Sequence, residues 1–518
     1  MSQETSFMRK FFLITFVLIA SAIVLPSALS AARINEHANQ SVPHTALLSG
    51  VAAKIDKHVL QTLQKGEATR TLIVMAEQAD VSAANNLKTK QEKGRYVFDT
   101  LRATADRTQA GVRAQLDQLG LSYRAYYVAN VIAVENLDAN AAFQIAARPE
   151  VGHISANPDV HFIEPVSRGP STEAAAGVEW GVQKIRAPKL WDLKFKGKGI
   201  VVANQDTGVQ WTHPALKNRY RGYNKKTGKA DHSYNWWDAI HNDIDGNSNP
   251  CGYNSAKPCD DNDHGTHTMG TMVGKAGANE IGVAPRAKWI SCRNMDSGTG
   301  RPSAYIECFQ FFLAPWDKDG NNPDPAKAPD VVSNSWGCPP SEQCNPDDIK
   351  AATENVRAAG IFVSVSAGNS GSACETVEDP PAIYDASTTV GATDIGDALA
   401  NFSSRGLVTV DSSNLRKPDI SAPGVNVRSS VPNNSYANFS GTSMAAPHVA
   451  GAVALLWDAI PSLRGDVDAT ETAFFNSAKR SVKAGNQVCG GTSSANIPNN
   501  LFGYGRLDVW KAYKKSLP

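Results

Sequence analysis

Three residues with the types needed for nucleophilic chemistry lie in three short segments far apart in the sequence. Asp206 stands in NQDTGV, His264 opens HGTHTMGTMVG, and Ser443 stands in GTSMAAPHVAG. A serine hydroxyl is a poor nucleophile at neutral pH unless a base takes its proton. A neutral imidazole can be that base, and a carboxylate behind it fixes the tautomer and stabilises the imidazolium. We therefore predict a serine nucleophile that His264 and Asp206 activate.

A fourth segment, SAGNSG, places Asn369 just after the apolar run Ile361–Val365. Its side-chain amide is a neutral donor, and such a donor stabilises negative charge that develops on a carbonyl oxygen. The alternative is an asparagine that only serves a turn, which is common. We predict the first role, because Asn369 adds the one group that the other three residues lack.

Each of these residues also has a purely structural interpretation. Ser443 precedes an apolar helical stretch and could be its N-cap, and Asp206 could be a turn residue. His264 and His267 are three residues apart and could share a helix face as metal ligands. The pattern His-Glu-x-x-His is absent, however, and no third ligand is evident. We predict that His264 transfers protons at a site without a metal and that His267 packs in the core.

The elements that must position these residues follow a repeated pattern. GIVVANQDTGV, DVVSNSWG and IFVSVSAGNSG each join a β-branched run to a polar loop, and helical stretches such as Asp348–Gly360 separate the runs. This alternation predicts an α/β fold with a mostly parallel central sheet flanked by helices. In such sheets the functional groups lie beyond the carboxyl ends of the strands, which is where Asp206 and Asn369 stand.

Residues 70–165 have a different order of elements, β-α-β-β-α-β. This order predicts a small α+β unit of the ferredoxin-like, split βαβ type. Its expected elements are Thr71–Glu77, Tyr96–Gly120, two strands within Tyr123–Leu137, Asn140–Glu150 and Val160–Pro165. Residues 166–179 are mainly small and polar, with Pro and Gly, so we expect an exposed linker with a processing site. Residues 180–518 then form the α/β domain.

The first 31 residues have the order of a secretory signal peptide. Arg9 and Lys10 precede the apolar run Phe11–Leu25, and small residues follow up to Ala32. A membrane anchor is the alternative, but spanning usually takes about 20 apolar residues. We expect export with removal of residues 1–31, followed by a polar segment, 32–69. The predicted protein is secreted and has no stable membrane anchor.

Export affects the expected state of the eight cysteines, which all lie in the range from Cys251 to Cys489. In an oxidising compartment an even number of cysteines favours disulfides. The close pairs Cys251/Cys259 and Cys338/Cys344 could close small loops, but the sequence alone does not choose among the pairings. A zinc site would need tight Cys-x-x-Cys spacing, which is absent.

The composition argues against a nucleic-acid partner, and two acidic stretches raise the question of bound calcium. The formal net charge of +1 implies no bulk attraction to nucleic acid. Two acidic stretches, Asn242–Asn247 and Asp317–Pro325, carry Asp and Asn around Gly, as calcium loops do. Neither ends in the Glu of an EF-hand loop. We therefore expect solvated turns, with structural calcium as the alternative.

Four segments, DTGV, DHGTHTMGTMVG, SAGNSG and GTSMAAPHVAG, resemble the signature blocks of the subtilisin-like serine proteases (subtilases) and follow that family's order. The resemblance covers about Trp180 to the C-terminus, where GYGRLDVWKA is similar to the closing segment of the family's domain. CDDNDHGTH and SWGCPP are similar to the bacillopeptidase-type branch. Residues 70–165 resemble the family's inhibitory propeptide, which also assists folding.

The resemblance implies a role for each of the four chemical residues. Asp206 would orient His264, which would act first as general base and then as general acid. Ser443 would attack the peptide carbonyl, and Asn369 would share the oxyanion hole with the backbone N–H of Ser443. This chemistry would require no cofactor.

The resemblance also implies residues that bind the substrate. Ser335, Trp336 and Gly337 match an edge segment against which a substrate adds as an extra strand. Glu378, in TVEDP, matches the floor of the S1 pocket, which receives P1, the residue whose carbonyl is attacked. A carboxylate there would favour Lys or Arg at P1. The alternative is an exposed Glu with no bearing on specificity.

Together these features predict a secreted serine endopeptidase that is made as a precursor. Its partners would be protein or peptide substrates and its own propeptide as an intramolecular inhibitor, and we expect a monomer. The linker would be cut after about Pro165. The rival hypothesis is a catalytically silent subtilase-like protein that binds peptides, and a zinc hydrolase is a more remote one.

Overall fold

The computed structural model describes residues 50–244, 246 and 249–517. The expected signal peptide, residues 1–31, and much of the polar segment 32–69 lie outside these residues. A search of the described helices finds none that is both long enough and apolar enough to cross a membrane.

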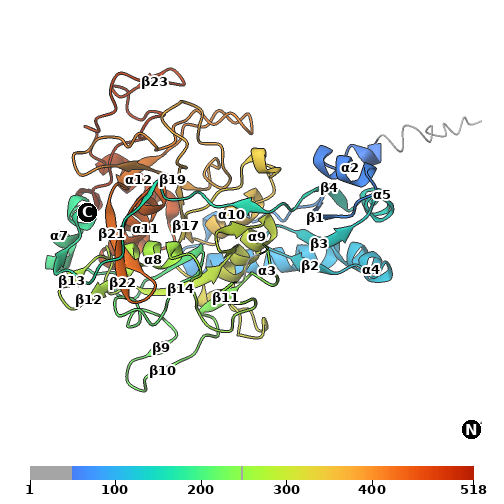
Figure 1. Ribbon diagram of the computed structural model, residues 1–518, viewed down its shortest axis with the longest axis horizontal. Helices are drawn as coiled ribbons and strands as arrows, with labels where there is room; N and C mark the ends of the chain where they lie inside the picture. Colours follow the sequence, from blue (N-terminus) through green and yellow to red (C-terminus); the bar gives the residue numbers. More distant parts are fainter. Residues whose placement is uncertain (1–49, 245, 247–248, 518) are drawn as a thin grey trace, which may run out of the picture. The chain divides into compact units, whose positions relative to one another are not determined.

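A seven-stranded sheet forms the centre of the α/β region, residues 180–517 (Figure 1). Its strand order is β11-β14-β8-β17-β18-β19-β20, and every neighbouring pair is parallel. This finding confirms the prediction of a mostly parallel central sheet. The strands are β8 Val201–Asp206, β11 Trp236–Asp238, β14 Lys288–Arg293, β17 Val331–Asn334, β18 Phe362–Ser366, β19 Thr388–Thr393 and β20 Ile420–Pro423.

Helices cover both faces of this sheet. Alternate residues of a strand point to opposite faces, and apolar side chains lie on both. Val331 belongs to a hydrophobic cluster with helices α8 and α11, whereas Val332 belongs to a cluster with α9 and α10. The strands therefore have apolar residues on both faces, which explains their continuous β-branched runs. The helices of this region are α6 Trp180–Lys184, α7 Ala187–Asp192, α8 His264–Val273, α9 Pro302–Leu313, α10 Lys350–Ala358, α11 Thr442–Ala459, α12 Val467–Ser477 and α13 Val509–Lys515.

Residues 50–156, which we call the small region, form a four-stranded sheet of order β2-β3-β1-β4. Strand β1 lies between β3 and β4 and is antiparallel to both. A capping box of Thr89 and Glu92 starts the long helix α3. The elements are α2 Lys57–Gln64, β1 Thr69–Met75, α3 Lys90–Thr108, α4 Ala110–Gln118, β2 Tyr123–Tyr126, β3 Val131–Leu137, α5 Ala139–Ala146 and β4 Val151–Ala156. From β1 onward the order is β1-α3-α4-β2-β3-α5-β4, in which α3 and α4 together take the place of the single helix expected between the first two strands.

Two features of the small region differ from the sequence-based expectation. Its last strand is β4, and Val160–Pro165 lies outside its sheet, because the apolar side chains of that segment contact the α/β region instead. Helix α2 lies in a segment without an evident pattern. Only Val59 and Leu63, four residues apart, bury it in the core of the small region.

Short strands tie the expected linker to the α/β region near both of its ends. Strand β6 pairs with β22, and β7 pairs with β13, while most side chains between them are exposed. The short strands are β5 Val160–His161, β6 Ser167–Arg168, β7 Gly177–Val178, β9 Tyr223–Asn224, β10 Lys229–Ala230, β12 Lys275–Ala276, β13 Asn279–Glu280, β15 Met295–Asp296, β16 Thr299–Gly300, β21 Val427–Val431, β22 Ser435–Ser440, β23 Val488–Cys489 and β24 Thr492–Ser493.

All eight cysteines are paired. The two close pairs suggested by the sequence are confirmed, with separations of 8 and 6 residues. The other two disulfides join residues 16 and 115 positions apart. The four bonds are Cys251–Cys259, Cys292–Cys308, Cys338–Cys344 and Cys374–Cys489.

The Cys374–Cys489 disulfide is expected to contribute most to stability, because a disulfide that closes a longer loop removes more entropy from the unfolded chain. Replacing both cysteines by Ala should lower the free energy of unfolding by about 4.7 kcal/mol, the value for a loop of roughly 100 residues. The matched double replacement of Cys251 and Cys259 should cost less than about 3 kcal/mol. Urea unfolding followed by tryptophan fluorescence measures both, and equal losses would contradict the prediction.

Candidate active site

Asp206 and His264 meet at the carboxyl end of the central sheet. Asp206 is the last residue of β8, and His264 is the first residue of α8. The Oδ1 of Asp206 lies 2.7 Å from Nδ1 of His264, and neither side chain is exposed. The carboxylate also accepts hydrogen bonds from the N–H of Thr207 at 2.8 Å and from Oγ1 of Thr268 at 3.2 Å. These contacts fix its orientation behind the imidazole.

Small residues let α8 approach β8 closely enough for this contact. A Cβ added to Gly265 would overlap the carbonyl oxygen of Gly208 and lie 3.1 Å from Cβ of Asp206. The N–H of Gly265 donates to Oγ1 of Thr207 at 3.0 Å, which ties the first turn of α8 to the loop after β8. Gly265 and Thr207 therefore help to set the distance between Asp206 and His264.

His264 and Ser443 each carry one reactive atom without a hydrogen-bond partner. Because Asp206 accepts at Nδ1 of His264, the imidazole proton lies on Nδ1 and Nε2 carries the lone pair. Among the described residues, neither Nε2 of His264 nor Oγ of Ser443 has a partner, and both atoms are buried. Buried polar atoms are rarely left unpaired. A base and a nucleophile that await a substrate would leave these two atoms free.

The first turn of α11 holds Asn369 in place. Oδ1 of Asn369 accepts hydrogen bonds from the N–H and from Oγ1 of Thr442, both at 2.9 Å. Nδ2 is therefore free to donate to another group. Ser443 is the next residue of the same turn, where unpaired N–H groups and the helix dipole favour negative charge. An amide donor and a hydroxyl thus meet at the start of α11.

Residues 160–166 of the same chain, which we call the covering segment, lie against this site. Strand β5 at its start pairs antiparallel with β16. The N–H of Phe162 donates to the carbonyl oxygen of Gly298 at 2.9 Å. The ring of Phe162 lies 5.0 Å from the ring of His264, measured between centroids. The covering segment therefore begins as an added strand beside the candidate base.

The covering segment also reaches the amide of Asn369. Nδ2 of Asn369 donates to the carbonyl oxygen of Glu164 at 2.9 Å. Two residues later, the N–H of Val166 donates to the carbonyl oxygen of Ser440 at 2.7 Å. If the amide of Asn369 serves as the oxyanion donor expected from the sequence, this carbonyl oxygen lies at the position of the oxyanion. The main chain of the segment thus lies as that of a bound peptide would.

The expected substrate-binding residues after β17 are buried near the same site. Oγ of Ser335 donates to the carbonyl oxygen of Ser443 at 3.4 Å, and the ring of Trp336 stacks on Tyr305 with centroids 3.9 Å apart. Within the described chain, Ser335–Gly337 takes part in no β-ladder, and the covering segment pairs with β16 instead. Sequence reasoning missed β16. The one available signal was the pair of glycines in SGTG, since glycine leaves the backbone open to close approach.

Glu378, which was expected at the floor of the S1 pocket, is half-buried in the loop between β18 and β19. Its neighbour Asp379 is more deeply buried, with 7% of its surface exposed. Burial raises the pKa of Asp379 to about 7, and the nearby carboxylates of Glu378 and Glu342 act in the same direction. Two adjacent carboxyl groups of this loop, those of Glu378 and Asp379, therefore lie near each other, and sequence reasoning named only Glu378.

His267 is a packed core histidine, as the sequence analysis expected. Its Nε2 lies 3.1 Å from the carbonyl oxygens of both Val427 and Ala437, so this nitrogen carries the proton and donates. Its ring stacks on Phe439 with centroids 4.3 Å apart. Burial lowers the pKa of His267 to about 3, and the nearby His264 acts in the same direction. The imidazole is therefore neutral at neutral pH.

In the part of the chain that the structure describes, no group of His, Cys, Asp and Glu could hold a metal ion. Within the acidic stretch Asp317–Pro325, the carboxylate of Asp317 accepts from the N–H groups of Asp319 and Asn321 and from Nδ2 of Asn322. Its oxygens therefore serve a turn. Three residues in or next to the other acidic stretch, 245, 247 and 248, lie outside the described residues.

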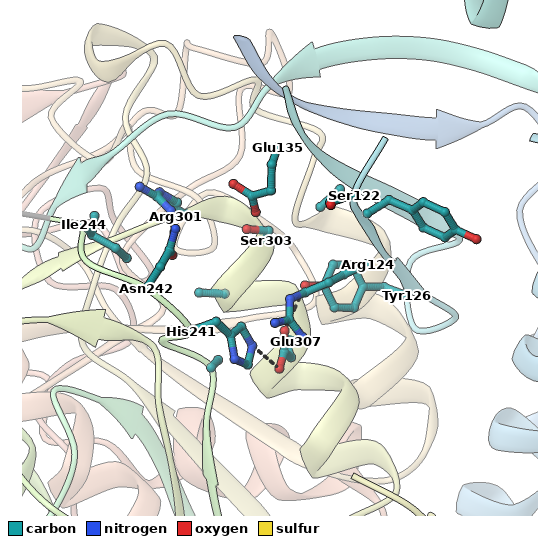
Figure 2. A pocket seen from close by; sticks show the side chains of 14 residues that line it. Ser122, Arg124, Tyr126, Glu135, His241, Asn242, Ile244, Arg301, Ser303 and Glu307 are labelled. Atoms are coloured by element: carbon teal, nitrogen blue, oxygen red, sulfur yellow. Dashed lines mark hydrogen bonds and ion pairs between the residues drawn. The ribbon is translucent and has the colours of Figure 1, made fainter. Parts of the chain in front are cut away.

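A separate pocket of about 490 Å³ is lined by residues of β2, β3 and α9 (Figure 2). Glu307 of α9 accepts a hydrogen bond from the hydroxyl of Tyr126 in β2 at 2.9 Å, and it pairs with Nε2 of His241 at 2.9 Å. Burial is the largest single effect and would lower the pKa of His241, but the hydrogen bond to Glu307 and the negative charge of that carboxylate together outweigh it, so the pKa is raised. These side chains join the small region to the α/β region, so we do not assign the reaction to this pocket.

Comparisons with known proteins agree on one family. The model of the subtilase family matches residues 197–505. Bacillopeptidase F of Bacillus subtilis (strain 168) is 37% identical over 474 residues, which cover 86% of this chain and 30% of that protein. The chain thus spans less than a third of Bacillopeptidase F.

Two shorter relatives are covered more completely. The major intracellular serine protease of Bacillus subtilis (strain 168) is 33% identical over 279 residues, which cover 53% of this chain and 74% of that protein. Subtilisin E of the same organism is 28% identical over 415 residues, which cover 79% of this chain and 92% of that protein. These matches confirm the resemblance to subtilases, including the bacillopeptidase branch.

The buried neutral state of His267 predicts a loss of stability in acid. The unfolded chain binds a proton at a histidine below about pH 6.5, whereas folded His267 does so only near pH 3. The stabilisation is therefore present above pH 6.5 and is lost as the pH falls toward 3, by about 1.4 kcal/mol for each pH unit. His267→Gln should flatten the decline in the free energy of unfolding between pH 6.5 and 4.5.

Urea unfolding at several pH values measures this slope. The matched control is His58→Gln, because the side chain of His58 is exposed. This control should leave the decline as steep as in the wild type. A decline that is the same in His267→Gln and in the wild type would contradict a buried neutral His267.

Proposed function

The chain belongs to the subtilase family, and we propose that it is a secreted serine endopeptidase that cleaves peptide bonds through an acyl-enzyme on Ser443. One observation carries the proposal. The 2.7 Å contact between Asp206 and His264 occupies Nδ1 of the imidazole, while Nε2 of His264 and Oγ of Ser443 are both buried without a hydrogen-bond partner among the described residues. The substrates would be proteins or peptides, and the chemistry needs no cofactor.

In the proposed mechanism, each residue acts at a defined atom. Nε2 of His264 takes the hydroxyl proton of Ser443 as Oγ attacks the substrate carbonyl carbon. Asp206 keeps the imidazole in the required tautomer and stabilises the imidazolium. Nδ2 of Asn369 and the N–H of Ser443 donate hydrogen bonds to the oxyanion. The imidazolium then gives its proton to the leaving amine, and water releases the acyl group by the same steps.

We further propose that the chain is exported as a precursor, in which residues 70–165 are a ferredoxin-like inhibitory propeptide. The covering segment supports this idea, because its Glu164 carbonyl accepts from Asn369 and thereby blocks the site to other peptides. Cleavage in the linker, residues 166–179, would free the site after residues 1–31 are removed on export. The mature enzyme would act as a monomer outside the cell.

Polar side chains of the α/β region support this role for the small region. Gln310 of α9 accepts hydrogen bonds from the N–H groups of Tyr127 and Val128, at 2.6 and 3.2 Å. Nδ2 of Asn355 in α10 donates to the carbonyl oxygen of Val128 at 2.8 Å. Asp348 accepts from the hydroxyl of Ser155 at 2.7 Å. These contacts hold the small region while the covering segment lies in the site.

Covalent labelling by a fluorophosphonate tests the proposal, because the reaction needs an activated serine. The processed wild type should be labelled, and Ser443→Ala should be neither labelled nor cut in its linker. Ser413→Ala is the matched control, since Ser413 is exposed, and it should be labelled like the wild type. A folded and processed wild type that takes no label would instead favour the catalytically silent, peptide-binding hypothesis.

Replacement of Asn369 tests the proposed oxyanion contact. Asn369→Ala should lower kcat by roughly 100- to 1000-fold, which is about 2.7–4 kcal/mol of transition-state stabilisation, with KM almost unchanged. Asn369→Asp keeps an acceptor for Thr442 but loses the amide donor, so it should lower kcat by the same factor as Asn369→Ala. Steady-state kinetics on variants processed by added wild-type enzyme measure both. Full activity of Asn369→Asp would show that Asn369 acts only by holding α11.

A further inference from the structure

We propose that Asp379, which lies near Asn369, makes the proposed active site select substrates with Lys or Arg at P1. This inference rests on the proposed endopeptidase function, and it names the class of substrate that the same site would take. It assigns the selection to a residue that the sequence signature did not single out. Four observations carry it: the position of Asp379, its lack of a partner, the residue of the covering segment that lies next to it, and the charges around it.

Asp379 lies between two segments that flank the candidate site. A Cβ added to Gly337, after β17, would lie 2.6 Å from Cβ of Asp379 and 3.0 Å from Cδ1 of Ile163. A Cβ added to Gly368, next to Asn369, would lie 3.4 Å from Oδ2 of Asp379. The carboxyl group therefore faces the space that Ile163 of the covering segment enters.

The carboxyl group of Asp379 has no partner of its own. Across the described residues, no hydrogen bond or ion pair is made by its side chain, although only 7% of the residue is exposed. Buried carboxylates are normally paired, because the loss of hydration is costly. The charged groups nearby are themselves acidic, which makes the space around Asp379 a site for a cation.

The covering segment does not supply that cation. Cδ1 of Ile163, an apolar residue, lies 3.0 Å from the position that a Cβ on Gly337 would occupy, next to Asp379. The side chain of Glu164 turns away and pairs with Arg168 at 2.8 Å. In a productive complex one residue would supply both the side chain in the pocket and the carbonyl on Asn369. In the covering segment, Ile163 supplies the side chain next to Asp379, whereas Glu164 supplies the carbonyl on Asn369. The segment therefore fits the site poorly as a substrate.

Asp379 is favoured over Glu378 as the selecting group because of burial. Glu378 is half-buried, whereas Asp379 is only 7% exposed and lies next to both Gly337 and Gly368. An ion pair made by an enclosed carboxylate is screened less than one made at the surface. Glu378 adds to the negative potential, but its removal should matter less than that of Asp379.

A panel of peptides that differ only at P1 tests the inference. With Lys, Arg, Phe, Ala or Glu at P1, the wild type should cleave the Lys and Arg peptides with kcat/KM roughly 30-fold or more above the Phe peptide. If no peptide is cleaved, the proposed function fails. If all are cleaved without a preference for Lys or Arg, only this inference fails.

Variants assign the preference to one carboxyl group. Asp379→Asn should bring the Lys:Phe ratio of kcat/KM close to one, and Asp379→Glu, which keeps the charge, should retain most of it. Glu378→Gln should lower the ratio less. Asp385→Asn is the control, because Asp385 is an exposed acidic residue of the same loop, and it should leave the ratio unchanged. An unchanged ratio in Asp379→Asn would overturn the assignment.

The pH dependence of the ratio is a second readout. Asp379 has a pKa of about 7, so its carboxyl group gains charge as the pH rises from 6 to 8, and the Lys:Phe ratio should rise with it. Any effect of pH that is common to both peptides cancels in the ratio. The other titratable groups around Asp379 are Glu378, Glu342, its partner His161, and the Tyr305 hydroxyl. A ratio that is flat in the wild type, or that still rises in Asp379→Asn, would contradict the inference.

Discussion

The 2.7 Å hydrogen bond between Asp206 and His264 joins the end of β8 to the first turn of α8. For this bond to form, a helix must approach a central strand at almost backbone contact. Gly265 permits the approach, because a larger residue would overlap the carbonyl oxygen of Gly208. Since β8 is held between β14 and β17, the carboxylate cannot shift to relieve a misfit. The site therefore depends on packing of the whole sheet as much as on the identity of its polar residues.

Much of this arrangement could be predicted from the sequence, because it is encoded locally. The strands of the central sheet are buried on both faces, so they appear as apolar runs, and the polar residues that end them mark one edge of the sheet. Asp206 and Asn369 follow such runs, and the structure brings them to that edge beside the first turns of α8 and α11. The signature segments also led to the correct family. These features can be predicted without knowledge of any contact between residues far apart in the sequence.

The remaining features depend on contacts between residues far apart in the sequence. Val160–Pro165 has the apolar composition of a strand of the small sheet, but its partner β16 lies well over a hundred residues later in the chain. The Cys374–Cys489 bond joins positions 115 residues apart, and no spacing rule selects it. Asp379 carries no signature of its own, since only the fold encloses it between Gly337 and Gly368. Local patterns cannot reveal such partners, because the chain must fold before they meet.

The cysteines are confined to one part of the molecule. All eight lie from Cys251 onward, and all four bonds stay within the α/β region. The only covalent connection between the small region and the α/β region is therefore the polypeptide backbone. Once that backbone is severed, what remains between the two pieces is a reversible complex. The dissociation rate and the dilution of the two pieces then set the lifetime of this complex. Reducing agents would shorten this lifetime only indirectly, by breaking the disulfides that stabilise the α/β region.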